Sequence, residues 1–298
     1  MNNQKESGKT WKVIDLINTS TEYFSNRGIE NPRLNAELLL ASILNWNRVD
    51  LYVNYDQPVK PDEIAAYKAL IKRRSQNEPL QYILGHTEFM GFVFEVNPAV
   101  LIPRPETELL VEHIVKSAAE LCYTSPSIID IGTGSGCIAV SLARLIPRSA
   151  VYAVDVSLDA LKIAQENAVT NQDLENTPLP IQFFPYDVFS DWPENLPKKF
   201  DILVSNPPYI AQSEMPALPE EVLHHEPEIA LCDGADGLKF YQRIFELSKN
   251  KIRVSWLYLE MSGSQPEKII KTAEQYGFQN IQVKKDLNGI DRILSIRV

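Results

Sequence analysis

Apolar residues in the second half of the chain fall into short runs separated by stretches of helical periodicity. Runs rich in β-branched and aromatic residues predict strands, and seven such runs lie at residues 127–131, 150–156, 181–184, 200–206, 256–261, 280–285 and 293–298. Helical patterns between them occur at residues 137–146, 157–169 and 237–249. This alternation predicts a doubly wound α/β domain with a mostly parallel, seven-stranded, Rossmann-like sheet.

The N-terminal part of the chain carries helical patterns only. One helix is expected to end at Arg27-Gly28, and Asn31-Pro32 predicts an N-cap residue followed by proline at the first position of the next helix. A further helix is expected to open at Pro61 and to end in the basic cluster of residues 72–74, which we interpret as a solvated helix end. We therefore expect a small N-terminal helical bundle.

A short alternating segment at residues 87–96 separates the two patterns. Its aromatic and β-branched residues flank Met90-Gly91, which predicts a β-hairpin. The expected domain boundaries are therefore residues 1–85 for the helical domain, 86–100 for a hairpin connector and 101–298 for the α/β domain.

A glycine-rich turn follows the first strand of the α/β domain and opens a helix. Alternate glycines allow a tight turn and close approach of a ligand, and the positive end of a helix suits a phosphate or carboxylate. The turn consists of Gly132, Thr133, Gly134, Ser135 and Gly136. Asp155 ends the second strand, where its carboxylate could accept both hydroxyls of a ribose. Turn and acid together indicate a nucleoside, and Asp187 and Val188 after the third strand are expected near its adenine edge.

The sequence Asn206-Pro207-Pro208-Tyr209 stands at the end of the fourth strand. Two prolines hold the chain rigidly, at the strand end where α/β sheets bind ligands. The Asn206 side-chain oxygen and the Pro207 carbonyl can accept the two N–H bonds of a planar NH2 group, and Tyr209 can stack on its face. This would aim an sp2 nitrogen at a sulfonium methyl group, with positioning and dipoles supplying the catalysis. The motif predicts an S-adenosylmethionine-dependent methyltransferase for a planar amide or amino nitrogen.

Charge and composition limit the partners and the cellular compartment that we expect for this protein. The net charge is −10, yet residues 1–85 hold 11 basic and 10 acidic side chains while residues 86–298 hold 18 and 29. A strongly acidic catalytic half disfavours non-specific binding to a phosphate backbone. The sequence has no membrane-length apolar stretch, no secretory-signal pattern at its start, and three scattered cysteines. We expect a cytoplasmic monomer with no membrane partner and no direct nucleic-acid partner.

Several other polar residues are candidates for a role near the site. Arg104 and Glu106 could form an ion pair at the rim of the cofactor site, and Glu226-Pro227 could border the substrate entrance, with structural roles equally open. Cys137 begins the helix after the glycine turn, where a thiol pKa can be lowered, but we interpret it as a packing residue because no His/Asp partner is evident. No metal is expected, since methyl transfer needs none and the histidines have too few ligand neighbours.

Taken together, these motifs resemble the protein-(glutamine-N5) methyltransferases that modify class I peptide chain release factors. The resemblance covers nearly the whole chain and is carried by PLQYILGHTEF, LIPRPETE, DIGTGSG, SNPPYI and EPEIALCDGADGL. It implies that Gly132 to Gly136, Asp155, Val188 and Asn206 contact S-adenosylmethionine. It also implies that Asn206 to Tyr209 hold the substrate glutamine, which belongs to a Gly-Gly-Gln motif of the release factor. The helical domain, near-neutral and without catalytic motifs, is expected to recognise the protein substrate.

Two alternatives remain open at this point. An N6-adenine methyltransferase of DNA or RNA also uses an Asn-Pro-Pro-Tyr-type motif on an exocyclic amine, although the acidic charge and the lack of an obvious nucleic-acid module count against it. The second alternative is a cofactor-binding module without catalytic activity that acts through its helical domain. The intact Asn206–Tyr209 motif counts against this alternative.

Overall fold

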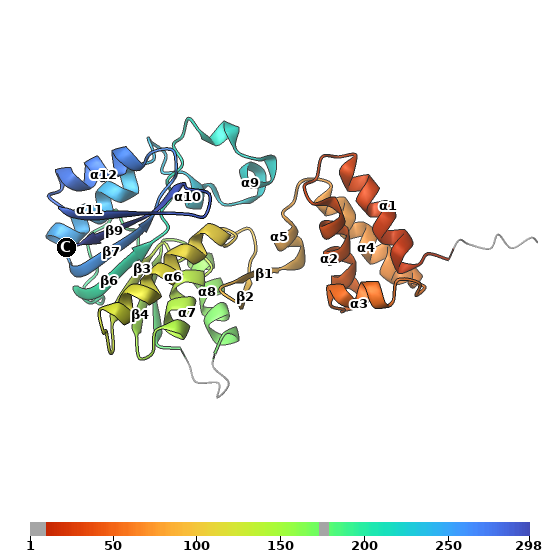
Figure 1. Cartoon of the computed structure of the whole chain (residues 1–298), viewed down its shortest axis with the longest axis horizontal. Helices are drawn as coiled ribbons and strands as arrows, with labels where there is room; N and C mark the ends of the chain where they lie inside the picture. The colour runs from red at the N-terminus through yellow and green to blue at the C-terminus, as the bar shows by residue number, and fades with distance from the viewer. Residues whose placement is uncertain (1–9, 173–178) are drawn as a thin grey trace, which may run out of the picture. The chain divides into compact units, whose positions relative to one another are not determined.

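The computed structural model describes residues 10–172 and 179–298, which fall into two compact units that divide between Leu84 and Gly85 (Figure 1). Each unit has a hydrophobic core of its own. None of the helices within the described ranges combines the length and the apolarity needed to cross a membrane.

The first unit is a helical bundle. Apolar side chains from its helices, among them Leu16, Phe24, Leu39 and Tyr67, meet in one core, and the Tyr67 hydroxyl donates to the Ala36 carbonyl at 3.0 Å. A buried tyrosine hydroxyl needs such a partner. The helices are α1 (Val13–Ser25), α2 (Pro32–Leu44), α3 (Arg48–Val53), α4 (Pro61–Arg74) and α5 (Leu80–Leu84).

Asn31 is the N-cap residue of α2 and Pro32 opens the helix, as predicted, but two local details of the bundle were not expected. Asn31 precedes the proline that opens α2, but it adopts a left-handed conformation (φ 48°) and its side chain makes no cap hydrogen bond. The Asn35 side chain instead donates to the carbonyls of Glu30 and Asn31. Arg74 is buried and donates to Asn35 Oδ1 at 2.7 Å. Because a buried guanidinium needs hydrogen-bond partners, the interpretation of residues 72–74 as a solvated end is wrong for Arg74.

The second unit contains a seven-stranded sheet with strand order β5-β4-β3-β6-β7-β9-β8. The first five strands in this order are parallel, and β9 runs antiparallel to both of its neighbours. This confirms the predicted fold class. The strands are β3 (Ser127–Ile131), β4 (Ala150–Asp155), β5 (Ile181–Pro185), β6 (Lys199–Ser205), β7 (Arg253–Glu260), β8 (Asn280–Lys285) and β9 (Asp291–Arg297).

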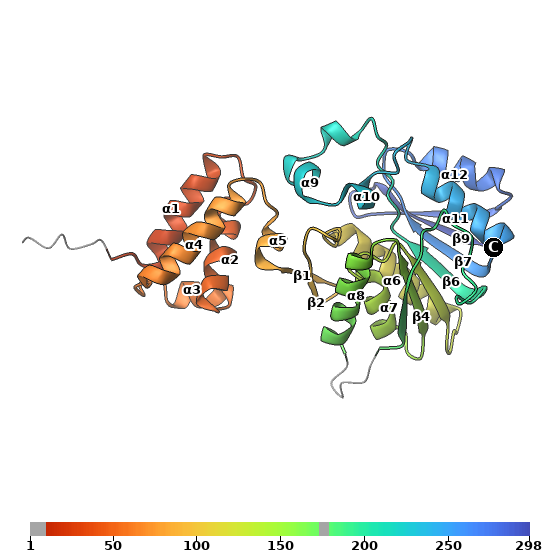
Figure 2. The ribbon, with the colours of Figure 1, turned by 180° about the vertical axis from the view of Figure 1, so that it is seen from behind.

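Helices cover both faces of this sheet (Figures 1 and 2). Alternate residues of a strand point to opposite faces, so Ile129 and Ile131 pack under α11 (Lys239–Asn250) and α12 (Pro266–Gln275). Ile128 packs in the other core, with α6 (Pro105–Glu120) and α7 (Cys137–Leu145). Burial on both faces explains why the central strands are continuous apolar runs. The remaining helices are α8 (Leu158–Thr170), η1 (Met215–Ala217), α9 (Glu220–His225) and α10 (Glu228–Leu231).

A two-stranded hairpin precedes α6. Strands β1 (His86–Phe89) and β2 (Phe92–Glu95) pair antiparallel, and the turn residues Met90 and Gly91 have φ values of 53° and 76°. Positive φ at both central positions is the geometry of a tight hairpin turn. Phe89 and Phe94 are buried in the core shared with α6 and α7, so the hairpin is part of the sheet-containing unit.

One asparagine ties this hairpin to the rest of its unit. Asn167 of α8 is fully buried. Its Oδ1 accepts from the Glu95 N–H at 2.7 Å, and its Nδ2 donates to the carbonyls of Glu95 at 3.0 Å and Ser135 at 2.9 Å. The same side chain therefore anchors strand β2 and the glycine-rich turn.

We expect Asn167→Ala to destabilise the protein by roughly 2–4 kcal/mol, because two backbone groups of Glu95 and the buried Ser135 carbonyl lose their partner. Denaturant-induced unfolding measures the change, and Gln165→Ala on the exposed face of α8 is the matched control. Equal stability of the two variants would contradict the anchoring role of Asn167.

Candidate active site

Two central strands bring the predicted site residues to one edge of the sheet. Strands β3 and β6 pair in parallel with Asp130 opposite Val204, and the Ser205 hydroxyl donates to the Ile131 carbonyl at 2.6 Å. The glycine-rich turn follows Ile131 directly, and Asn206 follows Ser205. Both therefore begin at the carboxyl edge, at the point where the strand order reverses, which is the usual ligand site of an open α/β sheet.

The glycines of the turn divide into two kinds. Gly132, Gly134 and Gly136 all have positive φ, between 55° and 80°, a conformation that favours glycine. A Cβ added at Gly132 or Gly134 would meet no atom within 4 Å, whereas one at Gly136 would lie 3.0 Å from the Ala164 Cβ. The first two thus leave an open stretch of backbone that a ligand can approach, and the third allows α7 to pack on α8.

Asp155 lies against this turn, at the end of β4. Its Oδ2 accepts from the Gly134 N–H and its Oδ1 from the Ser157 N–H, both at 2.9 Å. Burial raises the pKa of Asp155, while these two N–H groups lower it. Each carboxylate oxygen has more than one lone pair, so Asp155 can hold the turn and still accept hydrogen bonds from a ligand.

A second acid lies just before the turn, and no motif in the sequence predicts it as a site residue. Asp130 is fully buried in β3, and its Oδ2 accepts from the Thr133 hydroxyl at 2.7 Å. Burial, more than any other influence, raises the pKa of Asp130 to about 7, and the hydrogen bond from Thr133 opposes it. Its signal in the sequence is an acid within the apolar strand SIIDI.

The two residues predicted near the adenine edge differ in exposure, since Asp187 is exposed and Val188 is buried. Val188 is buried at 6% exposure, within the core on the α11–α12 side of the sheet, and its carbonyl accepts from Arg243 Nε at 2.7 Å. The Asp187 carboxylate accepts from the Phe189 N–H. Val188 therefore offers little side-chain surface, and its contact with a cofactor stays a prediction.

Residues of α6 and β7 form hydrogen bonds with side chains of the Asn206–Tyr209 loop. Asn206 Nδ2 donates to the Thr107 hydroxyl at 3.2 Å, and the Tyr209 hydroxyl donates to Glu260 Oε1 at 3.5 Å. Burial raises the pKa of Tyr209 above its ordinary value and that of Glu260 to about 7. Neither Thr107 nor Glu260 is part of a motif that predicts a site residue from the sequence. The available signal for Glu260 is the single acid that ends the apolar strand β7.

Residues 226–238 hold the same loop from its other side. The Ile210 N–H donates to the Leu231 carbonyl at 3.0 Å. Gly237 has a φ of 83°, and a Cβ there would lie only 2.5 Å from the Tyr209 carbonyl oxygen. Glycine is therefore required at position 237 for the two segments to approach this closely.

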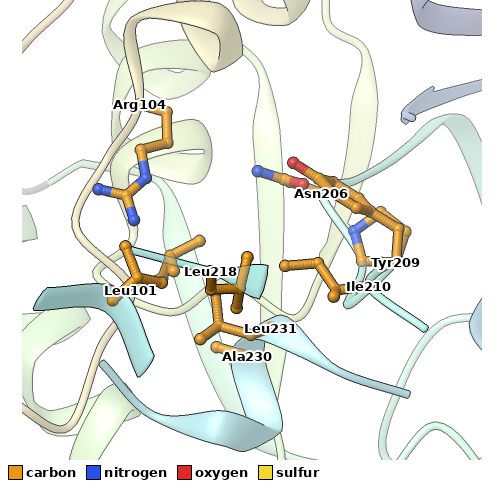
Figure 3. A pocket seen from close by; sticks show the side chains of 10 residues that line it. Leu101, Arg104, Asn206, Tyr209, Ile210, Leu218, Ala230 and Leu231 are labelled. Carbon is orange, nitrogen blue, oxygen red and sulfur yellow. The ribbon is translucent and has the colours of Figure 1, made fainter. Parts of the chain in front are cut away.

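A cavity of about 180 Å³ opens in front of Asn206, and Arg104 and Asn206 face it from opposite sides (Figure 3). A cavity of this size admits one side chain, since about 150 Å³ suffices for benzene. Its walls are mainly apolar and comprise Leu101, Arg104, Asn206, Pro207, Tyr209, Ile210, Leu218, Val222, Ala230 and Leu231.

Arg104 does not pair with Glu106 as the sequence analysis considered. It pairs with Glu226 instead, at 2.5 Å, and the Ile102 N–H also donates to the Glu226 carboxylate. The Glu226 side chain is 1% exposed, and a carboxylate that is so buried needs a charged or hydrogen-bonding partner. The ion pair thus joins the segment before α6 to the segment before α10 beside the cavity.

The other candidates take structural positions. Cys137 is buried, and burial raises the pKa of its thiol to about 12, which is the opposite of an activated thiolate. His113 contacts the Ser295 hydroxyl and the Tyr258 ring. Over residues 10–172 and 179–298, no group of three or more His, Cys, Asp or Glu side chains could hold a metal ion.

Comparison with known proteins identifies the family. Family models match residues 15–85 as PrmC N-terminal domain and residues 105–234 as Methyltransferase small domain. The catalytic domain of hMettl16, solved with an RNA hairpin of the MAT2A 3'UTR, superposes with a TM-score of 0.56 at 16% identity, over 92% of this chain and 90% of that one. This likeness concerns the fold alone.

Similarity at the level of the sequence is much higher. The release factor glutamine methyltransferase of Geobacter sulfurreducens is 38% identical over 98% of this chain and 99% of its own length. The one of Chlorobaculum tepidum is 38% identical over 96% and 97%. With this fold and this site, the chain belongs to the release factor glutamine methyltransferase family.

Proposed function

We propose that this protein transfers the methyl group of S-adenosylmethionine to the side-chain amide nitrogen, N5, of a glutamine in peptide chain release factors. The observation that carries the proposal is that Asn206 lines a cavity of side-chain size and follows Ser205, whose hydroxyl binds the Ile131 carbonyl directly before the glycine-rich turn. Membership of the family supports the substrate class. The resemblance of the motifs further indicates the glutamine of the Gly-Gly-Gln motif, and cytoplasmic action is part of the same proposal.

The carboxyl edge of the sheet fits the proposed cofactor. The open backbone at Gly132 and Gly134 can approach the amino-acid part of a ligand without a Cβ in the way. Asp155 keeps free acceptor sites for ribose hydroxyls beside its two backbone bonds. When bound, S-adenosylmethionine supplies an electrophilic methyl group on a sulfonium.

The cavity fits a glutamine side chain. Its apolar walls suit the methylene groups, and Arg104 and Asn206 supply polar groups at its sides. In the proposed role, Asn206 Oδ1 and the Pro207 carbonyl accept the two amide N–H bonds and thereby direct the nitrogen lone pair. The nitrogen forms a bond to the methyl carbon as the carbon–sulfur bond breaks, and it then loses one proton to solvent. No strong base is needed before attack, because the nitrogen becomes acidic only as it is methylated, so orientation and fixed dipoles carry the catalysis.

Transfer of labelled methyl groups tests the proposal as a whole. Purified release factor, the same protein with its Gly-Gly-Gln glutamine changed Gln→Ala, and nucleic acid are offered in parallel. We expect label only in the unchanged release factor. Label in nucleic acid would support an N6-adenine methyltransferase, and equal label in the Gln→Ala protein would place the methylated atom elsewhere.

Asp155→Ala is expected to weaken S-adenosylmethionine binding about 10- to 100-fold, because hydrogen bonds to a charged group contribute roughly 1.5–3 kcal/mol each. Isothermal titration calorimetry measures the affinity, and circular dichroism checks the fold, since Asp155 also binds the Gly134 N–H. Unchanged affinity in the folded variant would remove Asp155 from the proposed cofactor site.

The helical unit is proposed to recognise the protein substrate. It has a core of its own and none of the site residues described above. Deleting residues 1–84 should leave cofactor affinity measurable while abolishing methylation of intact release factor. Calorimetry and the label-transfer assay on residues 85–298 separate the two effects. A normal rate for the folded truncated protein would place recognition in the sheet-containing unit.

Asn206→Ala is expected to lower the rate of methyl transfer by roughly 10²–10³-fold, the usual effect of removing one preorganised hydrogen-bonding group from an active site. Cofactor affinity should change much less. Asn206→Asp keeps an acceptor of the same shape but adds a negative charge that favours the cationic ground state, so it should also be impaired, though less than Ala. Single-turnover transfer at saturating release factor measures the chemical step, and a near-normal rate for Asn206→Ala would refute the proposed orientation of the nitrogen.

A further inference from the structure

The ion pair between Arg104 and Glu226 leaves part of a guanidinium group free at the wall of the cavity. Arg104 Nη2 donates to Glu226 Oε1 at 2.5 Å, and the Ile102 N–H donates to Glu226 Oε2 at 3.3 Å. Both oxygens of this carboxylate are therefore bound. A guanidinium has five N–H donors, and within the described residues the bond to Glu226 is the single hydrogen bond of the Arg104 side chain. Arg104 thus keeps donors for a ligand.

The chain holds Arg104 stiffly in this position. Pro103 and Pro105 flank it, and Pro105 begins α6, so the backbone on both sides has a fixed φ. The Arg104 side chain is 34% exposed while that of Glu226 is 1% exposed. Among the described residues that line the cavity, Arg104 is the one charged side chain, and it lies opposite Asn206 (Figure 3).

Asn206 presents the complementary group on the other side of the cavity. Its Nδ2 donates to the Thr107 hydroxyl at 3.2 Å, and its Oδ1 has no hydrogen-bond partner among the described residues, which leaves this oxygen as an acceptor for a ligand. The cavity therefore has a donor at one wall and an acceptor at the other. A primary amide has an oxygen and an NH2 group and satisfies both, whereas a carboxylate has only acceptors.

Glu226 determines the charge that the cavity presents. A guanidinium without a partner would bind a carboxylate strongly, because hydrogen bonds between charged groups are roughly twice as strong as those between neutral groups. The Glu226 carboxylate in contact with Arg104 offsets this charge and repels a second carboxylate. A neutral amide meets no such repulsion and can still accept a hydrogen bond from the guanidinium.

We propose that the Arg104–Glu226 pair recognises the side-chain oxygen of the substrate glutamine, and that the neutrality of the pair makes the cavity select a primary amide over the carboxylate of a glutamate. Arg104 donates to the amide oxygen while Asn206 Oδ1 accepts from the NH2 group. Glu226 acts through Arg104 and is a positioning residue. The inference deepens the proposed function and rests on it.

Glu226→Gln tests the inference, because it keeps the shape and an acceptor for Arg104 but removes the negative charge. The readouts are the KM for release factor, the inhibition constant of release factor with a Gln→Glu change in its Gly-Gly-Gln motif, and cofactor affinity by calorimetry. The Gln→Glu protein should inhibit the wild-type enzyme weakly. In Glu226→Gln its inhibition constant should fall roughly 10- to 100-fold, the value of one hydrogen bond between charged groups, with much smaller changes in KM and cofactor affinity.

Two further variants separate charge from structure. Arg104→Met combined with Glu226→Gln removes both charges and keeps an acceptor for the Ile102 N–H. Its KM should rise roughly 10-fold, the value of one lost hydrogen bond, and it should not bind the Gln→Glu protein more tightly than wild type. Asp286→Asn removes the carboxylate of another buried pair, with Arg292 at 3.0 Å, which does not line the cavity. The ratio of the two constants should stay at its wild-type value there.

The double variant decides the question if Glu226→Gln does not fold, since replacing a whole buried ion pair by uncharged groups is often tolerated. An unchanged inhibition constant in folded Glu226→Gln would overturn the inference, as would an equal fall in the double variant, because the charge of Arg104 would then play no part. A wild-type KM in the double variant would show that the pair serves the structure alone. Failure of the proposed function itself is distinguished by the wild-type arm, in which no label would reach the release factor.

Discussion

The site depends on the pairing of strands β3 and β6, which the hydrogen bond from the Ser205 hydroxyl to the Ile131 carbonyl completes at their carboxyl ends. This bond joins the last residues of the two central parallel strands at 2.6 Å, at the place where the strand order reverses. The chain leaves β3 as the glycine-rich turn and leaves β6 as the Asn206–Tyr209 loop. Because the register of β3 and β6 is set by burial on both faces, the core fixes the spacing between the two loops.

Much of this arrangement could be predicted from local sequence. Strands buried on both faces are apolar runs, so the seven strands were found with their ends within a few residues of those observed. The positions of the glycine turn, Asp155 and Asn206 followed, because a parallel sheet brings its carboxyl ends to one edge. The roles given to these residues, and to Val188, stay predictions.

The residues that support the site could not be found in this way, because their partners are distant in sequence. Arg104 pairs with Glu226, 122 positions away, whereas the neighbouring Glu106 was one possible partner in the sequence. Glu260 lies near Thr107 only because β7 is beside β6 and α6 covers that face. The burial of Arg74 could not be predicted for the same reason. It depends on contact with Asn35 of another helix, and a run of basic residues does not indicate such a contact.

The carboxyl edge of the sheet is also unusual in its electrostatics. Asp130, Asp155 and Glu260 lie at or next to the ends of three strands, and burial raises the pKa of each. Desolvated carboxylates of this kind are stabilised by a nearby positive charge. Under the proposed function the methyl donor is cationic at sulfur, and the thioether that remains after transfer is not. Buried acids at this edge therefore favour the cationic donor over the uncharged thioether product, and this difference contributes to the exchange of product for a new donor.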